Sequence, residues 1–144
     1  MSKVKLVVTL AFCVFLTPAF AQSLAERKQY AFEDKSMAKE AESIAKKCRV
    51  TIPAKIDWNT FKDFDFKVFS PSSYCRIAFS AIGDICEISE DGLKSVQSKV
   101  KSLTCKQASP STLTLENGEL VYSFDFKNDY NIRDKVRAFL LEKL

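Results

Sequence analysis

Apolar and polar residues alternate along the chain with two different periods, and the changes of period divide it into elements. Between residues 35 and 47 the apolar side chains recur at the spacing of one helical face. From 48 to 58 they occupy every second position, which is typical of a strand with one buried face. Pro53 has no N–H to donate to a neighbouring strand, so we expect this strand at an edge of the sheet.

Two helices are predicted in the middle of the chain. The first begins after Ser70, because serine is a favoured N-cap and Pro71 suits the first helical position. It is expected to continue to about residue 85. The second begins near Ser89, with acidic residues at its start and lysines near its end, where they complement the helix dipole.

The clearest local signal is a hairpin within the segment TLTLENGELVYSFDF, residues 112–126. Asn117 and Gly118 suit a two-residue type I′ turn. This turn places Leu115 opposite Leu120, and the apolar alternation of both arms agrees with that register.

A final helix is predicted from about residue 130 to 144, so the expected order is helix, strand, two helices, three strands and a helix. This order predicts an α+β domain with a mainly antiparallel sheet of about four strands, covered on one face by helices. We assign residues 35–144 to this single domain. Ser23 followed by Glu26 would cap a helix start, but residues 22–34 are expected to form a flexible N-terminal extension.

The first 21 residues are typical of a cleaved secretory signal peptide. They combine two lysines, an apolar run of about eleven residues and small side chains before Ala21. A lipoprotein signal ending at Cys13 is the alternative, although Phe12 is bulkier than such processing favours. No later apolar segment is long enough to anchor the mature chain in a membrane. We therefore expect a secreted protein, located in the bacterial periplasm.

Removal of the signal peptide leaves four cysteines, and we predict that they form two disulfides, as is usual in oxidising compartments. Cys75 and Cys86 are eleven residues apart in one predicted helix, so they face the same way about 16 Å apart and cannot pair. Cys48 and Cys105 fall on the inward phase of predicted strands. An antiparallel pair of central helices favours Cys75–Cys105 with Cys48–Cys86. The pairing of Cys48–Cys75 with Cys86–Cys105 remains open.

The composition excludes much familiar chemistry. The chain contains no histidine, which is the commonest general base and zinc ligand. The cysteine spacing matches neither a redox motif nor a zinc site, so we expect no catalytic residue, metal or cofactor. The alternative is a histidine-free enzyme that uses carboxylates near Asp57, Asp63 and Asp65.

A binding role has more support from the sequence. Without Lys3 and Lys5, the basic residues number 20 against 18 acidic ones, and this near balance argues against nucleic acid. An unknown protein partner is expected on one of two surfaces. The first is a phenylalanine-rich loop with Phe61, Phe64, Phe66 and Phe69. The second is the outward phase of the strands, with Thr51, Lys55, Thr112, Thr114, Val121 and Ser123.

Several stretches taken together resemble a group of small, secreted, uncharacterised four-cysteine proteins of Gram-negative bacteria. They are CRVTIPAKIDWNTF, a YC pair, a helix ending in cysteine, KVKSLTC, LENGELVYSFDF and a terminal VRAFL, between Cys48 and Leu144. The resemblance implies a periplasmic location and paired cysteines, and implies no activity. The expected function is that of a small disulfide-bonded binding or interaction protein, comparable in class to envelope immunity proteins and inhibitors.

Overall fold

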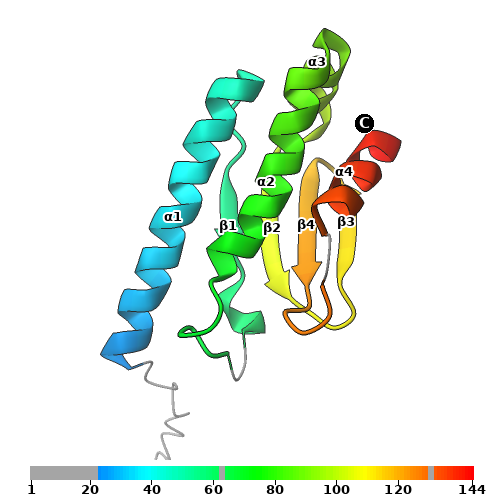
Figure 1. The fold of residues 1–144 in the computed structure, drawn as a ribbon. Coiled ribbons are helices and arrows are strands. Elements are labelled where there is room, and N and C mark those ends of the chain that lie inside the picture. The colour runs from blue at the N-terminus through cyan, green and yellow to red at the C-terminus, as the bar shows by residue number, and fades with distance from the viewer. Residues whose placement is uncertain (1–22, 62–63, 130–131) are drawn as a thin grey trace, which may run out of the picture.

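The computed structural model describes residues 23–61, 64–129 and 132–144 (Figure 1). The predicted signal peptide lies outside these residues. The elements follow the predicted order: α1 (Leu24–Cys48), β1 (Ala54–Ile56), a short 3-10 helix η1 (Trp58–Thr60), α2 (Pro71–Ile88), α3 (Glu90–Lys99), β2 (Ser102–Gln107), β3 (Thr112–Glu116), β4 (Glu119–Phe124) and α4 (Ile132–Lys143).

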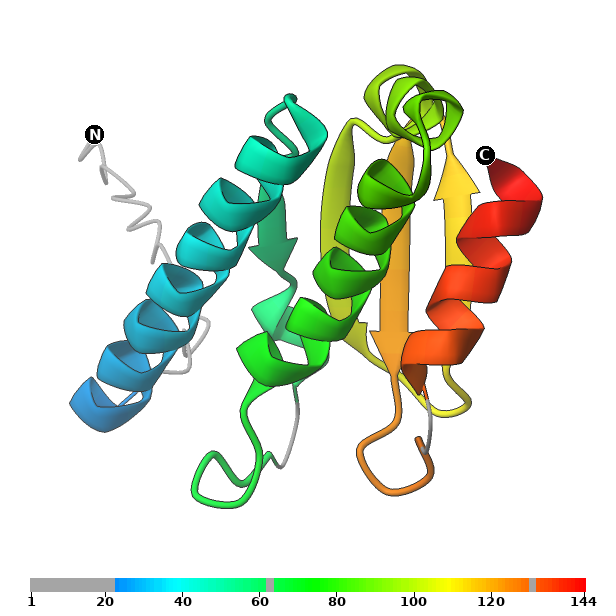
Figure 2. The ribbon, with the colours of Figure 1, turned by 45° about the horizontal axis from the view of Figure 1, so that its top comes forward.

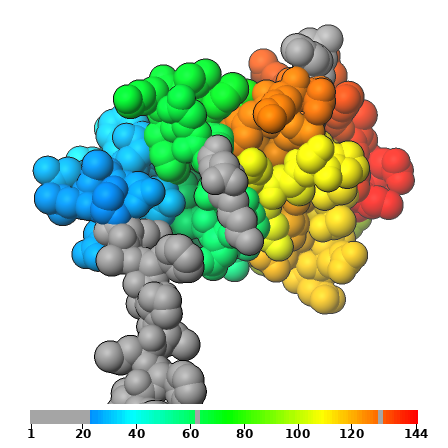
Figure 3. Space-filling model, turned by 90° about the horizontal axis from the view of Figure 1, so that it is seen from below, coloured from blue at the N-terminus to red at the C-terminus, as the bar shows by residue number. Residues whose placement is uncertain are grey.

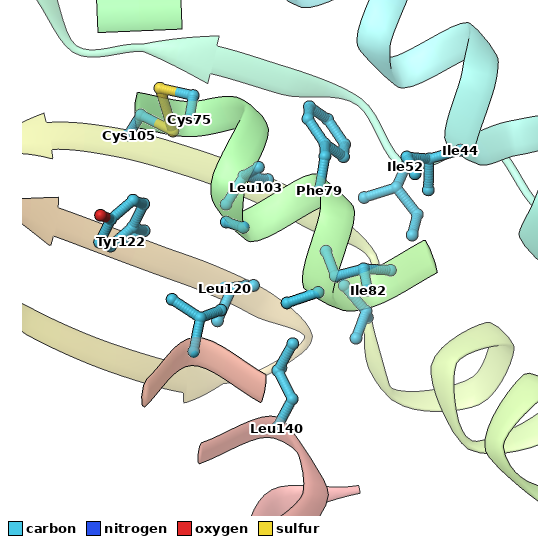
Figure 4. Close-up of a cluster of buried hydrophobic side chains, with 14 of the residues drawn as sticks. Ile44, Ile52, Cys75, Phe79, Ile82, Leu103, Cys105, Leu120, Tyr122 and Leu140 are labelled. Atoms are coloured by element: carbon cyan, nitrogen blue, oxygen red, sulfur yellow. A yellow bond between two sulfur atoms is a disulfide. The ribbon is translucent and has the colours of Figure 1, made fainter. Parts of the chain in front are cut away.

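The helices and the sheet form two layers. Figures 1 and 2 show α1, α2 and α4 on the same side of the sheet, while α3 lies beyond one end of it. The side chains between the layers are fully buried, among them Leu103, Leu120 and Leu140 (Figure 4). An α+β fold with a four-stranded sheet and two disulfides is therefore confirmed.

The prediction of a mainly antiparallel sheet is wrong, because the sheet is mixed. Its strand order is β1-β2-β4-β3; β1, β2 and β4 run parallel to one another, and β3 is antiparallel to β4. The chain from β1 to β2 passes through α2 and α3 and so returns in the same direction, as crossover connections do. The hairpin then places β4 between β3 and β2, where it runs parallel to β2.

The hairpin itself has the predicted register. Leu115 pairs with Leu120, and Leu113 with Tyr122. The turn residue Asn117 has a φ of 51°, and the glycine that follows it has a φ of 85°. Positive φ at both positions is what a type I′ turn requires.

α1 is longer at both ends than the predicted helix 35–47. It starts at Leu24, where Ser23 and Glu26 form a capping box, so most of the expected flexible extension is helical. It ends at Cys48, because Arg49 takes a left-handed conformation with a φ of 52°. The predicted strand 48–58 is therefore reduced to Ala54–Ile56, which does lie at an edge of the sheet.

α2 is the central helix of the layer and is continuous, as predicted. Ser70 caps it and Pro71 is its first residue. Its buried stripe includes Phe79 and Ile82, which face the core in Figure 4. A Cβ at Gly83 would lie 2.9 Å from Cδ1 of Ile44, so the glycine allows α1 to approach α2 closely.

The two disulfides have the connectivity favoured by the sequence. Cys75–Cys105 joins α2 to β2 with a Cα–Cα distance of 6.0 Å, and Cys48–Cys86 has a Cα–Cα distance of 5.2 Å. The expectation that both bridges join a helix to a strand is wrong for the second, because Cys48 is the last residue of α1. That bridge connects two helices.

Candidate functional site

The face of the sheet opposite to the helices gathers most of the predicted binding residues. We call it the open face. One row of paired residues crosses all four strands and consists of Lys55, Thr104, Val121 and Thr114. In the next row, Thr112 pairs with Ser123. Of the six predicted residues on this surface, only Thr51 lies outside the strands; it is exposed in the segment that precedes β1.

Exposure differs along the open face. The central Thr104 is 2% exposed and Ser123 is 6% exposed, whereas Lys55, Thr112 and Thr114 on the outer strands are exposed. Thr104 is enclosed partly because its hydroxyl donates a hydrogen bond of 2.5 Å to Glu119. A partner would therefore contact mainly the two margins of this face.

A groove of about 490 Å³ lies at the β1 margin of the open face. Its lining consists of Lys55, Ile56, Asp57, Trp58, Asn59, Thr104, Lys106 and Glu119. Lys55 is 3.8 Å from Glu119, whose pKa is lowered chiefly by the hydrogen bond from Thr104 and further by the lysine charge. The groove thus presents both signs of charge, which suits a polar protein surface better than a strongly charged ligand.

Three phenylalanines of the predicted loop, Phe61, Phe64 and Phe69, pack against Phe124 or Phe126 at the end of β4 and just beyond it. Phe66 packs instead against Tyr30 and Trp58. Phe61 is 7% exposed, and Phe64, Phe66 and Phe69 are half-buried. The ring centroid of Phe64 is 4.4 Å from that of Phe126. These rings cover the core at the carboxyl end of β4. Only part of each half-buried ring is open to solvent.

A cavity of about 430 Å³ lies beside these rings, at the carboxyl ends of β2 and β4. Figure 3 views this end, where the loop before α2 (green) lies close to the segments that follow β2 (yellow) and β4 (orange). The lining combines the rings of Phe64, Phe69 and Phe126 with Thr60, Asp65, Gln107, Ala108, Ser109, Asp125, Lys127 and Asn128. Its size is that of a small-molecule pocket, and the carboxyl ends of parallel strands are a common ligand position.

Asp125 is the most constrained carboxylate of this cavity, and the sequence reasoning missed it. It accepts hydrogen bonds from the Ser109 hydroxyl at 2.7 Å, the Asn128 amide at 2.9 Å and the Lys127 backbone N–H at 2.9 Å. These bonds, with that of Ser109 first, lower the pKa of Asp125 to about 2. The sequence did contain a signal for this role. An aspartate side chain often accepts a hydrogen bond from the backbone N–H two residues later, which is the pattern of an Asx turn, and Asp125 and Lys127 have this spacing.

Glu33 is a second buried carboxylate that the sequence reasoning missed. It is 1% exposed and belongs to α1, yet it accepts hydrogen bonds from the Ser72 backbone N–H at 2.9 Å and the Ser70 hydroxyl at 2.8 Å. Gln29 donates a third bond at 3.1 Å. Its charge lies at the positive end of the α2 dipole, so it serves as a cap supplied by another helix.

The carboxylates proposed for an enzyme are not gathered in one pocket within the described residues. Asp57 lines the groove at the β1 margin of the open face, whereas Asp65 lines the cavity at the carboxyl ends of β2 and β4. Asp63 lies outside the described residues. Across residues 23–61, 64–129 and 132–144, no group of three or more potential metal ligands occurs. No helix in these ranges has the length and apolar character needed to cross a membrane.

The fold and the surfaces thus define a small two-layer α+β protein with two disulfides, an open sheet face and a cavity at the carboxyl ends of β2 and β4. Compared with protein-family models, curated proteins and solved structures, the chain matches none of them. Its function must therefore be inferred from the geometry.

Proposed function

We propose that this protein is a binding or interaction module of the bacterial periplasm that contacts a protein partner through the open face of its sheet. The observation that carries the proposal is the gathering of the predicted residues on that face. Lys55, Thr112 and Thr114 are exposed there, at the two margins of one continuous surface. α1, α2 and α4 occupy the opposite face (Figure 2).

The chemistry of the open face supports a protein partner. Threonine and serine side chains lose little rotamer freedom when a partner covers them, and their hydroxyls both donate and accept hydrogen bonds. Lys55 and Glu119 place opposite charges on the same surface, which favours a partner with a mixed charge pattern.

The disulfides support a location outside the cytoplasm. The four cysteines that remain after signal cleavage are all paired, and three of them are fully buried. Disulfides of this kind persist in oxidising compartments such as the periplasm. The expected signal peptide and the resemblance to secreted four-cysteine proteins point to the same compartment.

Site-specific photocrosslinking tests the proposal. A photoreactive amino acid replaces Thr114 on the open face, and a matched control replaces Lys135, which is exposed on α4. In cells that produce the protein, we expect position 114 to yield an adduct with a different polypeptide and position 135 to yield none. Equal labelling from both positions, or no heterologous adduct from 114, would refute the open face as the partner surface.

A further inference from the structure

β3 is an edge strand with less protection against pairing than the other edge strand of the sheet. The other edge strand, β1, has three residues, follows Pro53 and carries Lys55, all of which discourage a further strand. β3 has five residues, TLTLE, without lysine or proline. Within the described residues, no backbone hydrogen bond joins β3 to an element other than β4.

The hairpin register identifies the backbone groups that are free. Glu116 and Glu119 flank the two-residue turn and exchange hydrogen bonds, and such pairs recur at every second residue. Thr114 and Thr112 therefore bond to β4 as well. The N–H and C=O groups of Leu113 and Leu115 point the other way, toward the outer edge of the sheet.

We infer that β3 pairs with the β3 strand of a second copy of this chain, antiparallel and centred on Thr114. In this arrangement Leu113 lies opposite Leu115 of the second copy, and Leu115 lies opposite its Leu113. Both residues of each pair have their backbone groups directed outward, so the two pairs form four hydrogen bonds. In any other antiparallel register centred within β3, at least one of the two leucines lies opposite a residue that is not a leucine with outward N–H and C=O groups.

The side chains agree with the same register. Thr114 meets its own counterpart at a non-hydrogen-bonded position, where Cα atoms are about 4.5 Å apart. Glu116 lies opposite Thr112, so no like charges meet. Leu113 and Leu115 are half-buried and pack against the margin of the core together with Phe139. Pairing would place the leucines of the second copy beside them and extend the apolar layer.

The consequence is an eight-stranded sheet in which two open faces become one. The pairing stands whether or not that face binds a different protein, because it uses the edge of β3 and not its face. A short strand supplies the contact, so the dimer is expected to be reversible and dependent on concentration.

Two experiments test the pairing in the oxidised mature protein. Sedimentation equilibrium over a range of concentrations should show a monomer–dimer equilibrium. Leu113→Pro removes one outward N–H without removing a bond to β4, and proline is tolerated at a sheet edge. It should abolish the dimer, whereas Leu113→Val retains the N–H and should retain the dimer. A protein that is monomeric throughout, or a dimer that survives Leu113→Pro, overturns the inference.

Cysteine substitution tests the register without relying on the proline variant to fold. Thr114→Cys should form an interchain disulfide at position 114, identified by peptide mapping with both native bridges intact. Thr112→Cys is the matched control, because the two 112 positions would lie four residues apart along the strands, about 14 Å. Equal crosslinking of both variants, or crosslinking of neither, overturns the proposed register.

Discussion

Replacement of Glu33 by alanine should destabilise the protein strongly, although the sequence places this residue in a segment expected to be flexible. The carboxylate accepts bonds from Ser72, Ser70 and Gln29 and lies beneath the first turn of α2. Alanine leaves the Ser72 N–H buried and without its acceptor, because Ser72 is only 3% exposed.

The magnitude follows from two contributions. A buried donor left without a partner costs about 1–3 kcal/mol. Loss of a carboxylate at a partly buried helix N-terminus costs about 0.3–2 kcal/mol. The free energy of unfolding should therefore fall by about 1–5 kcal/mol in Glu33→Ala, which lowers the melting temperature of a domain of this size by roughly 5–20 °C. Glu33→Gln keeps one acceptor oxygen and should lose about half as much.

Urea unfolding followed by circular dichroism measures these differences in oxidised protein. Glu42→Ala is the matched control, because Glu42 is exposed on the same helix, and its effect should stay within about 0.5 kcal/mol. If Glu33→Ala is as stable as this control, or if Glu33→Gln is as destabilised as Glu33→Ala, the interhelical cap does not hold α1 against α2 as described.

Three further predictions address other parts of the fold. Replacing Cys48 and Cys86 together by alanine opens a loop with a sequence separation of 38, which should cost about 3.9 kcal/mol in urea unfolding; a loss below about 1 kcal/mol would contradict the paired assignment. The Tyr122 hydroxyl is buried without a partner in the described residues, so Tyr122→Phe should raise the melting temperature rather than lower it. Burial raises the pKa of Tyr122 above its ordinary value of 10.0; the wild type should therefore lose stability as the pH rises above 10 and the variant should lose less, which a pH series of melting curves checks. The pKa of Asp125 is lowered to about 2, so its contribution to stability is present above pH 4 and is lost as the pH falls toward 2; acid unfolding of Asp125→Asn should be less steep over that interval, and an unchanged slope would argue against the Asp125 hydrogen bonds.

The parts of the fold that the sequence predicted are those set by neighbouring residues. Ser70 and Pro71 begin α2 through contacts within one helical turn. Asn117 and Gly118 set the hairpin register through their own backbone conformation. Each of these signals acts over a few residues, so it can be identified without knowledge of the remaining chain.

The strand order was not predictable in the same way. The pairing of β4, the second strand of the hairpin, with β2 depends on contacts between segments that are distant in sequence. The apolar alternation from Cys48 predicted a strand that starts too early. Cys48 fits the first position of such a strand, but it fits the last turn of α1 equally well. The left-handed conformation of Arg49 decides between the two, and no glycine or asparagine marks it in the sequence.

In the candidate site, too, the features set by neighbouring residues were predictable and those set by distant contacts were not. The open face was predicted, because the phase of a strand places Thr112 and Thr114 on one side from local alternation alone. The cavity was not predicted, because it forms where the ends of β2 and β4 meet the loop before α2. The role of Glu33 depends on a contact with Ser72, 39 residues later in the chain.

The two disulfides overlap along the chain, since Cys75 lies between Cys48 and Cys86, and Cys105 lies beyond both. A single peptide-bond cleavage anywhere between residues 48 and 105 therefore leaves both fragments covalently joined by at least one bridge. A protease that cuts the loop before α2 would produce a nicked protein that runs as one molecule until it is reduced. In a compartment that contains proteases and no reductant for such bonds, cleavage of that loop would not by itself separate α1 from the sheet.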